Sequence, residues 1–191
     1  MNLSEVPCQP VATRLSILTG IDAAVATSMG EIRAVTSAAT MATFYVDDLD
    51  EAQLAANRRV VAISGSTCIA AALSDHQHFA AAYDKAGLAG FVIATRHAPD
   101  DLELDWLMVH PRHHGTGVAA ALMQAGLRWL GEDQPVWLTV IRHNERAIRF
   151  YRRFGFEIDP TATTSHAVPH WIMRRAGLAD AACGPDAQPA A

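Results

Sequence analysis

The chain has 191 residues, of which 50% are hydrophobic and 18% are charged, so it can bury the core of one domain and does not have the composition of a disordered protein. Its formal net charge of −5 is unlike that of proteins that grip phosphates with clustered Lys and Arg, so we expect no nucleic-acid partner. No basic stretch followed by an apolar one opens the sequence, and no apolar run approaches the roughly 20 residues of a membrane span, so we expect a cytoplasmic protein without a membrane partner.

The first predicted elements are a strand and a helix. Residues 14–19 (RLSILT) are typical of a short strand. Asp22 is a suitable N-cap for a helix that runs to about Ala38, because apolar residues recur there at helical spacing.

A second helical region follows. Asp48 or Asp50 is expected to cap a helix that continues toward Val61. The Ser64-Gly65-Ser66 tripeptide is expected to end this helix, with Ser66 capping a further short helix over residues 69–73.

The pattern then changes to strands. Residues 79–83 and 88–95 flank a turn at 84–87 and predict a hairpin. Residues 103–109 (ELDWLMV) predict a third strand, which Pro111 stops because proline has no N–H to donate to a ladder.

Helices and strands alternate in the remainder. In chain order we expect a helix over 117–130, a strand over 135–141, a helix from Asn144 to Phe154, and closing strands over 156–158 and 170–174. This order predicts an α/β (α+β) fold: a mixed, mostly antiparallel central sheet flanked by helices, with a central β-α-β crossover.

The Gly-rich turn before the helix at 117–130 has the features of an anion site. A helix start offers unpaired N–H groups and a positive dipole end, and Gly115 and Gly117 let the backbone approach a pyrophosphate. A nucleotide-binding P-loop would need a Lys that this turn lacks. A dinucleotide-binding turn would need a third glycine at the position of Ala120 and a place after the first strand of a parallel unit.

Two segments resemble the motifs of a known family, the GNAT acetyltransferases. Residues 103–122 resemble motif A, whose [QR]-x-x-G-x-[GA] signature falls on residues 114–119 with His in place of Gln or Arg; a register that starts at Arg112 also fits. Residues 135–156 resemble motif B through W-L-x-V, N-x-x-A-I-x-F-Y and G-F. The resemblance covers about residues 79–175.

The resemblance implies an acetyl-CoA-dependent N-acetyltransferase in which a primary amine attacks the thioester directly in a ternary complex. Acetyl-CoA is then a co-substrate, and the acceptor is a small-molecule amine or a protein N-terminal amine. The alternative is a catalytically inactive acyl-CoA-binding or regulatory module of the same fold. Many members of that family dimerise, so the resemblance is compatible with a homodimer.

The resemblance also implies roles for particular residues. Tyr151 is expected to be the general acid, and Glu103 the general base, directly or through a water. The expected cofactor-binding residues are Leu107, Met108 and Val109 on the strand; His114, Gly115, Thr116, Gly117, Val118 and Ala119 through their N–H groups; and Asn144, Ala147 and Tyr151 beside the pantetheine arm.

We expect one N-acetyltransferase domain over residues 1–175, with a family-type core over about 79–175 and variable substrate-side helices over about 20–75. Residues 176–191, rich in Ala, Gly, Pro and Asp, are expected to form a disordered tail. No metal is expected, because His113 and His114 have no carboxylate or Cys at ligand spacing. The three cysteines are likewise not spaced as metal ligands and are too few for a disulfide framework, which indicates a reducing compartment.

Overall fold

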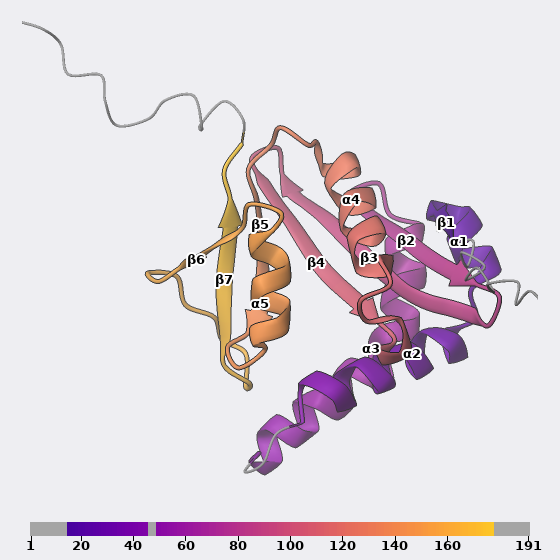
Figure 1. Ribbon diagram of the computed structural model, residues 1–191, viewed down its shortest axis with the longest axis horizontal. Helices are drawn as coiled ribbons and strands as arrows, with labels where there is room; N and C mark the ends of the chain where they lie inside the picture. Colours follow the sequence, from indigo (N-terminus) through magenta and orange to yellow (C-terminus); the bar gives the residue numbers. More distant parts are fainter. Residues whose placement is uncertain (1–14, 46–48, 178–191) are drawn as a thin grey trace, which may run out of the picture.

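The structure is a computed structural model that describes residues 15–45 and 49–177. A seven-stranded sheet runs through it in the order β1-β2-β3-β4-β5-β7-β6, and helices flank the sheet (Figure 1). The elements in chain order are β1 (Ser16–Thr19), α1 (Gly20–Ala26), α2 (Met29–Thr43), α3 (Glu51–Ala72), β2 (Gln77–Asp84), β3 (Gly87–Ala98), β4 (Asp101–Val109), a 3₁₀ turn η1 (Pro111–His113), α4 (Val118–Leu130), β5 (Val136–Ile141), α5 (Glu145–Arg152), β6 (Glu157–Asp159) and β7 (His170–Arg175).

The predicted fold class is confirmed. Strands β1 to β4 form an antiparallel meander, β7 pairs antiparallel with both β5 and β6, and β4 and β5 are parallel neighbours joined through α4. This parallel pair is the predicted β-α-β crossover. Asp48 and the predicted tail from residue 178 onward lie outside the described residues.

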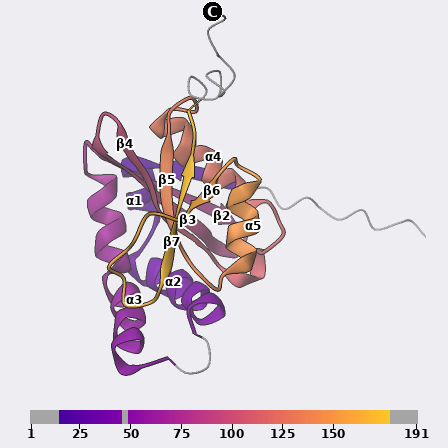
Figure 2. The ribbon, with the colours of Figure 1, turned by 90° about the vertical axis from the view of Figure 1, so that its left-hand side faces the viewer.

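The sheet is covered on both faces, as α3 and α5 on opposite sides of it illustrate (Figure 2). Helices α4 and α5 contribute to one core cluster with residues such as Ala80 and Val92, while α1, α2 and α3 contribute to the other with Phe79 and Phe91. Because side chains alternate along a strand, β2 and β3 bury residues on both faces, which explains their nearly continuous apolar sequences.

The first predicted helix is wrong in its extent, because the structure has two helices in place of one. Helix α1 ends at Ala26, and α2 starts after Ser28, whose side chain accepts from the Glu31 N–H while the Glu31 carboxylate accepts from the Ser28 N–H. This reciprocal capping box favours a new helix start within the apolar pattern. Asp22 lies in the first turn of α1 and is not its N-cap.

The predicted break at Ser64-Gly65-Ser66 is also wrong, because α3 is one continuous helix that Asp50 caps. Ser64 and Ser66 each donate to a carbonyl three residues back, so their hydroxyls do not compete with the helix. Gly65 lies where a Cβ would come within 2.8 Å of the Met29 Cβ. Close packing of α2 on α3, not a turn, therefore explains this glycine.

Strand β4 leaves its partner β5 shortly after their first contact, and the gap opens toward α2 and α3 (Figure 1). The only β4–β5 pair in the described residues is Glu103 with Trp137. On the other side of β4, Ile93 pairs with Trp106 and Ala94 with Leu104, so Asp105 is an extra, unpaired residue in a bulge. A bulge bends and twists its strand, which accounts for the divergence.

Candidate functional site

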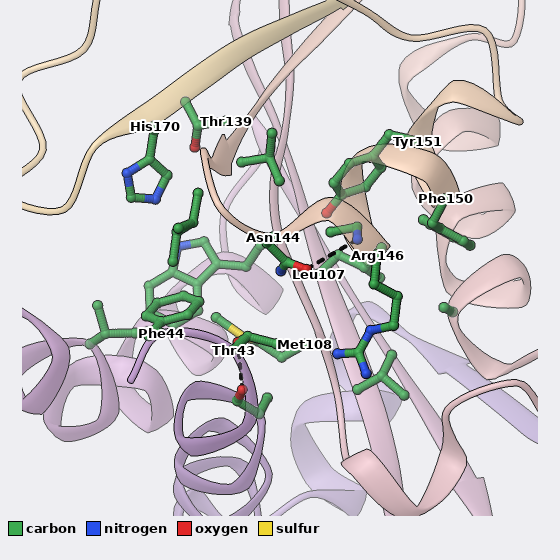
Figure 3. A pocket seen from close by; sticks show the side chains of 18 of the residues that line it. Thr43, Phe44, Leu107, Met108, Thr139, Asn144, Arg146, Phe150, Tyr151 and His170 are labelled. Carbon is green, nitrogen blue, oxygen red and sulfur yellow. Dashed lines mark hydrogen bonds between the residues drawn. The ribbon is translucent and has the colours of Figure 1, made fainter. Parts of the chain in front are cut away.

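A cleft of about 410 Å³ lies where β4 and β5 diverge (Figure 3). Its walls come from β4, β5, the loop before α4, the start of α4, α5, the end of α2, α3, and the segment that leads into β7. Of the predicted site residues, the cleft brings together Leu107, Met108, Val109, His114, Gly115, Ala119, Asn144, Ala147 and Tyr151. Thr116, Gly117, Val118 and Glu103 do not line it.

Beside the cleft, the loop before α4 leaves open space along its backbone. Gly115 and Gly117 have φ angles of 79° and 91°, and a Cβ built at either position would meet no atom within 4 Å. Gly117 is the N-cap of α4. A turn of this kind at a helix N-terminus fits an anionic group such as a pyrophosphate.

The loop N–H groups are not all free to bind an anion. The His114 N–H donates to the Pro111 carbonyl at 3.0 Å, and the Thr116 N–H donates to the His113 carbonyl at 3.3 Å. Val118 and Ala119 open α4, where the helix itself supplies no acceptor for their N–H groups. The N–H groups best placed for an anion are therefore those of Gly115, Gly117, Val118 and Ala119.

Arg146 makes this end of the cleft electropositive. Its Nη1 lies 2.8 Å from Nδ1 of His114, and both residues line the cleft. Burial, and then the charge of Arg146, lower the pKa of His114, so the ring accepts the guanidinium hydrogen bond in its neutral form. Arg146 is not among the site residues predicted from the sequence; its place in the first turn of α5, two residues after the N-cap, is the signal that could have identified it.

The diverging strands expose two free edges to the cleft. Leu107, Met108 and Val109 pair only with β3, and residues 139–141 of β5 pair only with β7. Their backbone groups on the other side have no strand partner in the described residues. An extended ligand with amide groups can pair with such edges as an added strand would.

Asn144 and Tyr151 enter the cleft from the α5 segment (Figure 3). The Asn144 Oδ1 accepts from the Ala147 N–H at 3.1 Å, which fixes this side chain as the N-cap of α5. Burial raises the pKa of Tyr151 to about 12, so its phenol stays protonated at neutral pH and can donate a proton.

The structure places Glu103 apart from the cleft. Its Oε2 lies 2.7 Å from Nε2 of His97, and it is buried between the strands. Burial raises the pKa of the Glu103 carboxyl, while the hydrogen bond from His97 opposes this shift. Glu103 could therefore act as a base only through an intervening group such as a water.

Asp105, the bulge residue, is the carboxyl group that lines the cleft. Burial, and then the neighbouring charge of Glu103, raise the pKa of Asp105 to about 7. Groups with a pKa near the working pH are suited to proton transfer. Glu103 and Asp105 are two residues apart, so a regular strand would put both side chains on one face, and the sequence carries no sign of the bulge at Asp105.

His170 lies on the same side of the cleft as Phe44 and across from Tyr151 (Figure 3). Its Nδ1 donates to the Val168 carbonyl at 2.6 Å, because a carbonyl can only accept, and Nε2 is left as an acceptor. Burial, and to a lesser extent the charge of His166, lower the pKa of His170 to about 4. This imidazole is therefore neutral at physiological pH.

Residues 15–45 and 49–177 hold neither a membrane-spanning helix nor a cluster of metal ligands. No helix there has both the length and the apolar character to cross a membrane. No group of three or more His, Cys, Asp or Glu side chains there is arranged to hold a metal ion.

The model of the acetyltransferase (GNAT) family matches residues 41–156, and the chain belongs to this family. Its sequence is similar to uncharacterized N-acetyltransferases of Mycobacterium tuberculosis and Mycobacterium bovis, with 41% identity over 78 residues. That match covers 40% of this chain, and the chain spans about half the length of these relatives (50%).

Solved structures share the fold. The PaiA N-acetyltransferase of Thermoplasma acidophilum, crystallised with coenzyme A, superposes with a TM-score of 0.66 at 17% identity, covering 85% of this chain and 99% of that one. The Ard1 structure from Thermoplasma volcanium gives a TM-score of 0.59 at 20% identity, over 86% and 98% of the two chains. At these identities the likeness establishes the fold alone.

Proposed function

We propose that this protein is an N-acyltransferase that transfers an acetyl group from acetyl-CoA to a primary amine. The observation that carries the proposal is the cleft itself, which combines an open glycine turn, two free strand edges, a buried carboxyl group and a buried phenol. Membership of the GNAT family supports the same activity.

The residues present fit coenzyme A. The N–H groups of Gly115, Gly117, Val118 and Ala119 would hold the pyrophosphate, with Arg146 supplying a positive charge beside it. The free edge at Leu107–Val109 would pair with the pantetheine amides. When bound, acetyl-CoA supplies the acetyl group as an activated thioester.

Two groups of the chain would move protons in this reaction. Asp105 would take a proton from the ammonium form of the substrate, because a carboxyl with a pKa of about 7 is partly ionised at neutral pH. Tyr151 would give its phenol proton to the leaving thiolate. Glu103 remains a predicted base through a water, and its charge also helps to raise the pKa of Asp105.

Calorimetric titration with acetyl-CoA, ATP and NAD, followed by an assay of free thiol with a panel of primary amines, tests this proposal. We expect saturable binding of acetyl-CoA alone and thiol release that requires an amine. Binding without thiol release from any amine would identify an acyl-CoA-binding module. No binding of acetyl-CoA would remove the proposed cofactor.

A further inference from the structure

The amide of Asn57 is a buried polar group in the wall of the cleft. Asn57 lies in α3 and is 1% exposed, and it lines the cleft. Its Nδ2 has no hydrogen-bond partner among the residues that the structure describes. A buried donor without a partner destabilises the folded state, so an amide in this position calls for a partner that arrives with a ligand.

Asn57 belongs to the side of the cleft that the proposed cofactor would leave open for the amine substrate. Tyr151 and Phe150 lie on one side of the cleft, while Phe44 and His170 lie on the other (Figure 3). Asn57 comes from α3, which packs against the helix that ends beside Phe44. It therefore lies on a different element of the cleft wall from the glycine turn and α5, which the proposed cofactor would contact.

The surroundings of Asn57 restrict the chemistry of a ligand. Ala56, Val60 and Phe44 offer apolar surface, and His170 is neutral. Among the described lining residues, Asp105 is the single carboxyl group. One carboxylate suits one ammonium group, whereas a polyamine would bring further positive charges without partners.

We propose that Asn57 is a substrate-positioning residue whose Nδ2 donates to a carbonyl oxygen near the reacting amine. The substrate class is then a monocationic primary amine with an apolar body and an adjacent carbonyl group, such as an amino-acid amide. This inference rests on the proposed acetyl transfer and specifies the acceptor of that same site. Asp105 binds the amino group and Asn57 donates a hydrogen bond to the carbonyl oxygen. The two contacts together fix the orientation of the substrate.

A matched pair of amines tests this role. Leucinamide carries a carbonyl beside its amino group, and 3-methylbutylamine has the same apolar body without the carboxamide. Asn57→Leu should lower kcat/KM for leucinamide about tenfold or more and change kcat/KM for 3-methylbutylamine by less than about twofold. Because the two amines differ in basicity, the result that counts is the change in their ratio between wild type and variant. Asn57→Ala should change the ratio in the same direction.

Ser64→Ala provides the matched control. Ser64 is buried on the same face of α3, two turns further on, but its hydroxyl already donates to the Val61 carbonyl and it does not line the cleft. Its loss should lower Tm and leave the amine ratio unchanged. Asn57→Leu should raise Tm in the ligand-free protein, because it removes an unpaired donor while conserving volume.

The possible outcomes distinguish failure of the proposed role of Asn57 from failure of the proposed acetyl transfer. Turnover of both amines with a ratio unchanged by Asn57→Leu would overturn the role of Asn57 and leave acetyl transfer standing. A wild-type preference for the triamine spermidine over leucinamide would overturn the monocationic substrate class. No thiol release with any amine would overturn acetyl transfer and this inference with it.

Discussion

At the scale of single residues, burial sets the protonation of the two groups that we assign to proton transfer. Removal from water is the largest cause of the raised pKa of both Asp105 and Tyr151, and for Asp105 it outweighs the opposing charge of His97. For Tyr151 the consequence is a phenol that keeps its proton until a stronger base appears. For Asp105 the consequence is a carboxyl that exchanges protons near neutral pH.

Replacement of Asp105 by Asn should lower activity without lowering stability. We expect kcat/KM to fall about a hundredfold, since a positioned base contributes about that much. The acidic limb of the wild-type pH profile, with a midpoint near the pKa of about 7, should disappear in Asp105→Asn. Steady-state kinetics between pH 5 and about 9 would show both effects.

The stability of the same variant follows from linkage. The pKa of Asp105 is raised in the folded state from 3.8 to about 7, so the folded protein holds the extra proton and wild-type stability falls as pH rises through that window. Asp105→Asn removes this penalty and should raise Tm at pH 8 but not at pH 4. Equal Tm changes at both pH values, or undiminished activity, would contradict the assignment.

Tyr151→Phe removes a phenol oxygen and keeps the ring that packs in the core. We expect kcat to fall about ten- to a hundredfold, while the Kd for acetyl-CoA changes by less than about threefold. Stopped-flow turnover and calorimetry on the same preparation would measure the two quantities. If kcat is unchanged, the acid is another group.

At the scale of elements, the segments that follow local rules were predictable. The strand–turn–helix of β4 and α4 and the Asn144 cap of α5 were confirmed, because proline, glycine and capping residues act within a few positions of their place in the chain. The continuity of α3 was not predictable, because Gly65 is explained by a contact with Met29 from another helix.

In the candidate site too, features set within one segment were predictable, and features set by contacts between distant segments were not. The glycine turn could be selected from its own segment, and Tyr151 and Asn144 from the resemblance of residues 135–156 to motif B. The position of Asp105 depends on a bulge that arises where β4 pairs with β3, and the role of Asn57 depends on which face of α3 meets the cleft. Such pairings between distant segments leave no local signal in a single sequence.

Gly117→Asp tests the loop that begins α4. The φ of 91° at this N-cap disfavours a side chain, and a carboxylate there would occupy the open space with a negative charge. We expect acetyl-CoA affinity to fall by a factor of about 100 or more, as calorimetry would measure, since an anion is repelled where one should bind.

A matched control lies at the other end of the same helix. Gly131, the C-cap of α4, has a φ of 108°, and a Cβ there would meet only the Gln134 side chain. Gly131→Asp should therefore lower Tm at least as much as Gly117→Asp and preserve acetyl-CoA affinity. Equal losses of affinity in the two variants would show that strain in α4, and not the anion site, accounts for the effect.

At the scale of the whole molecule, a net negative protein is proposed to bind a strongly anionic cofactor. The formal charge of −5 opposes this binding at long range, so the local positive groups at Arg146 and the α4 N-terminus must dominate nearby. The proposed binding would also span β4 and β5, and so connect the two halves of the sheet.

Thermal unfolding should show whether acetyl-CoA binding stabilises the folded protein. At a concentration about a hundredfold above Kd, acetyl-CoA should stabilise the fold by about 2.7 kcal/mol, which is several degrees in Tm for a chain of this size. ATP and NAD at the same concentration should give little shift. A Tm that does not depend on acetyl-CoA concentration would contradict binding to the native state.

The divergence of β4 and β5 also bears on self-association. Unpaired strand edges on a protein surface are templates for intermolecular β-pairing, and natural proteins cap or cover them. Here the two free edges face each other within a cleft that α2, α3 and α5 help to wall. A slender extended molecule can enter that space, whereas the bulky strand of a neighbouring protein meets the surrounding helices first. The geometry that we assign to cofactor binding therefore also shields these two internal edges of the sheet from pairing with another chain.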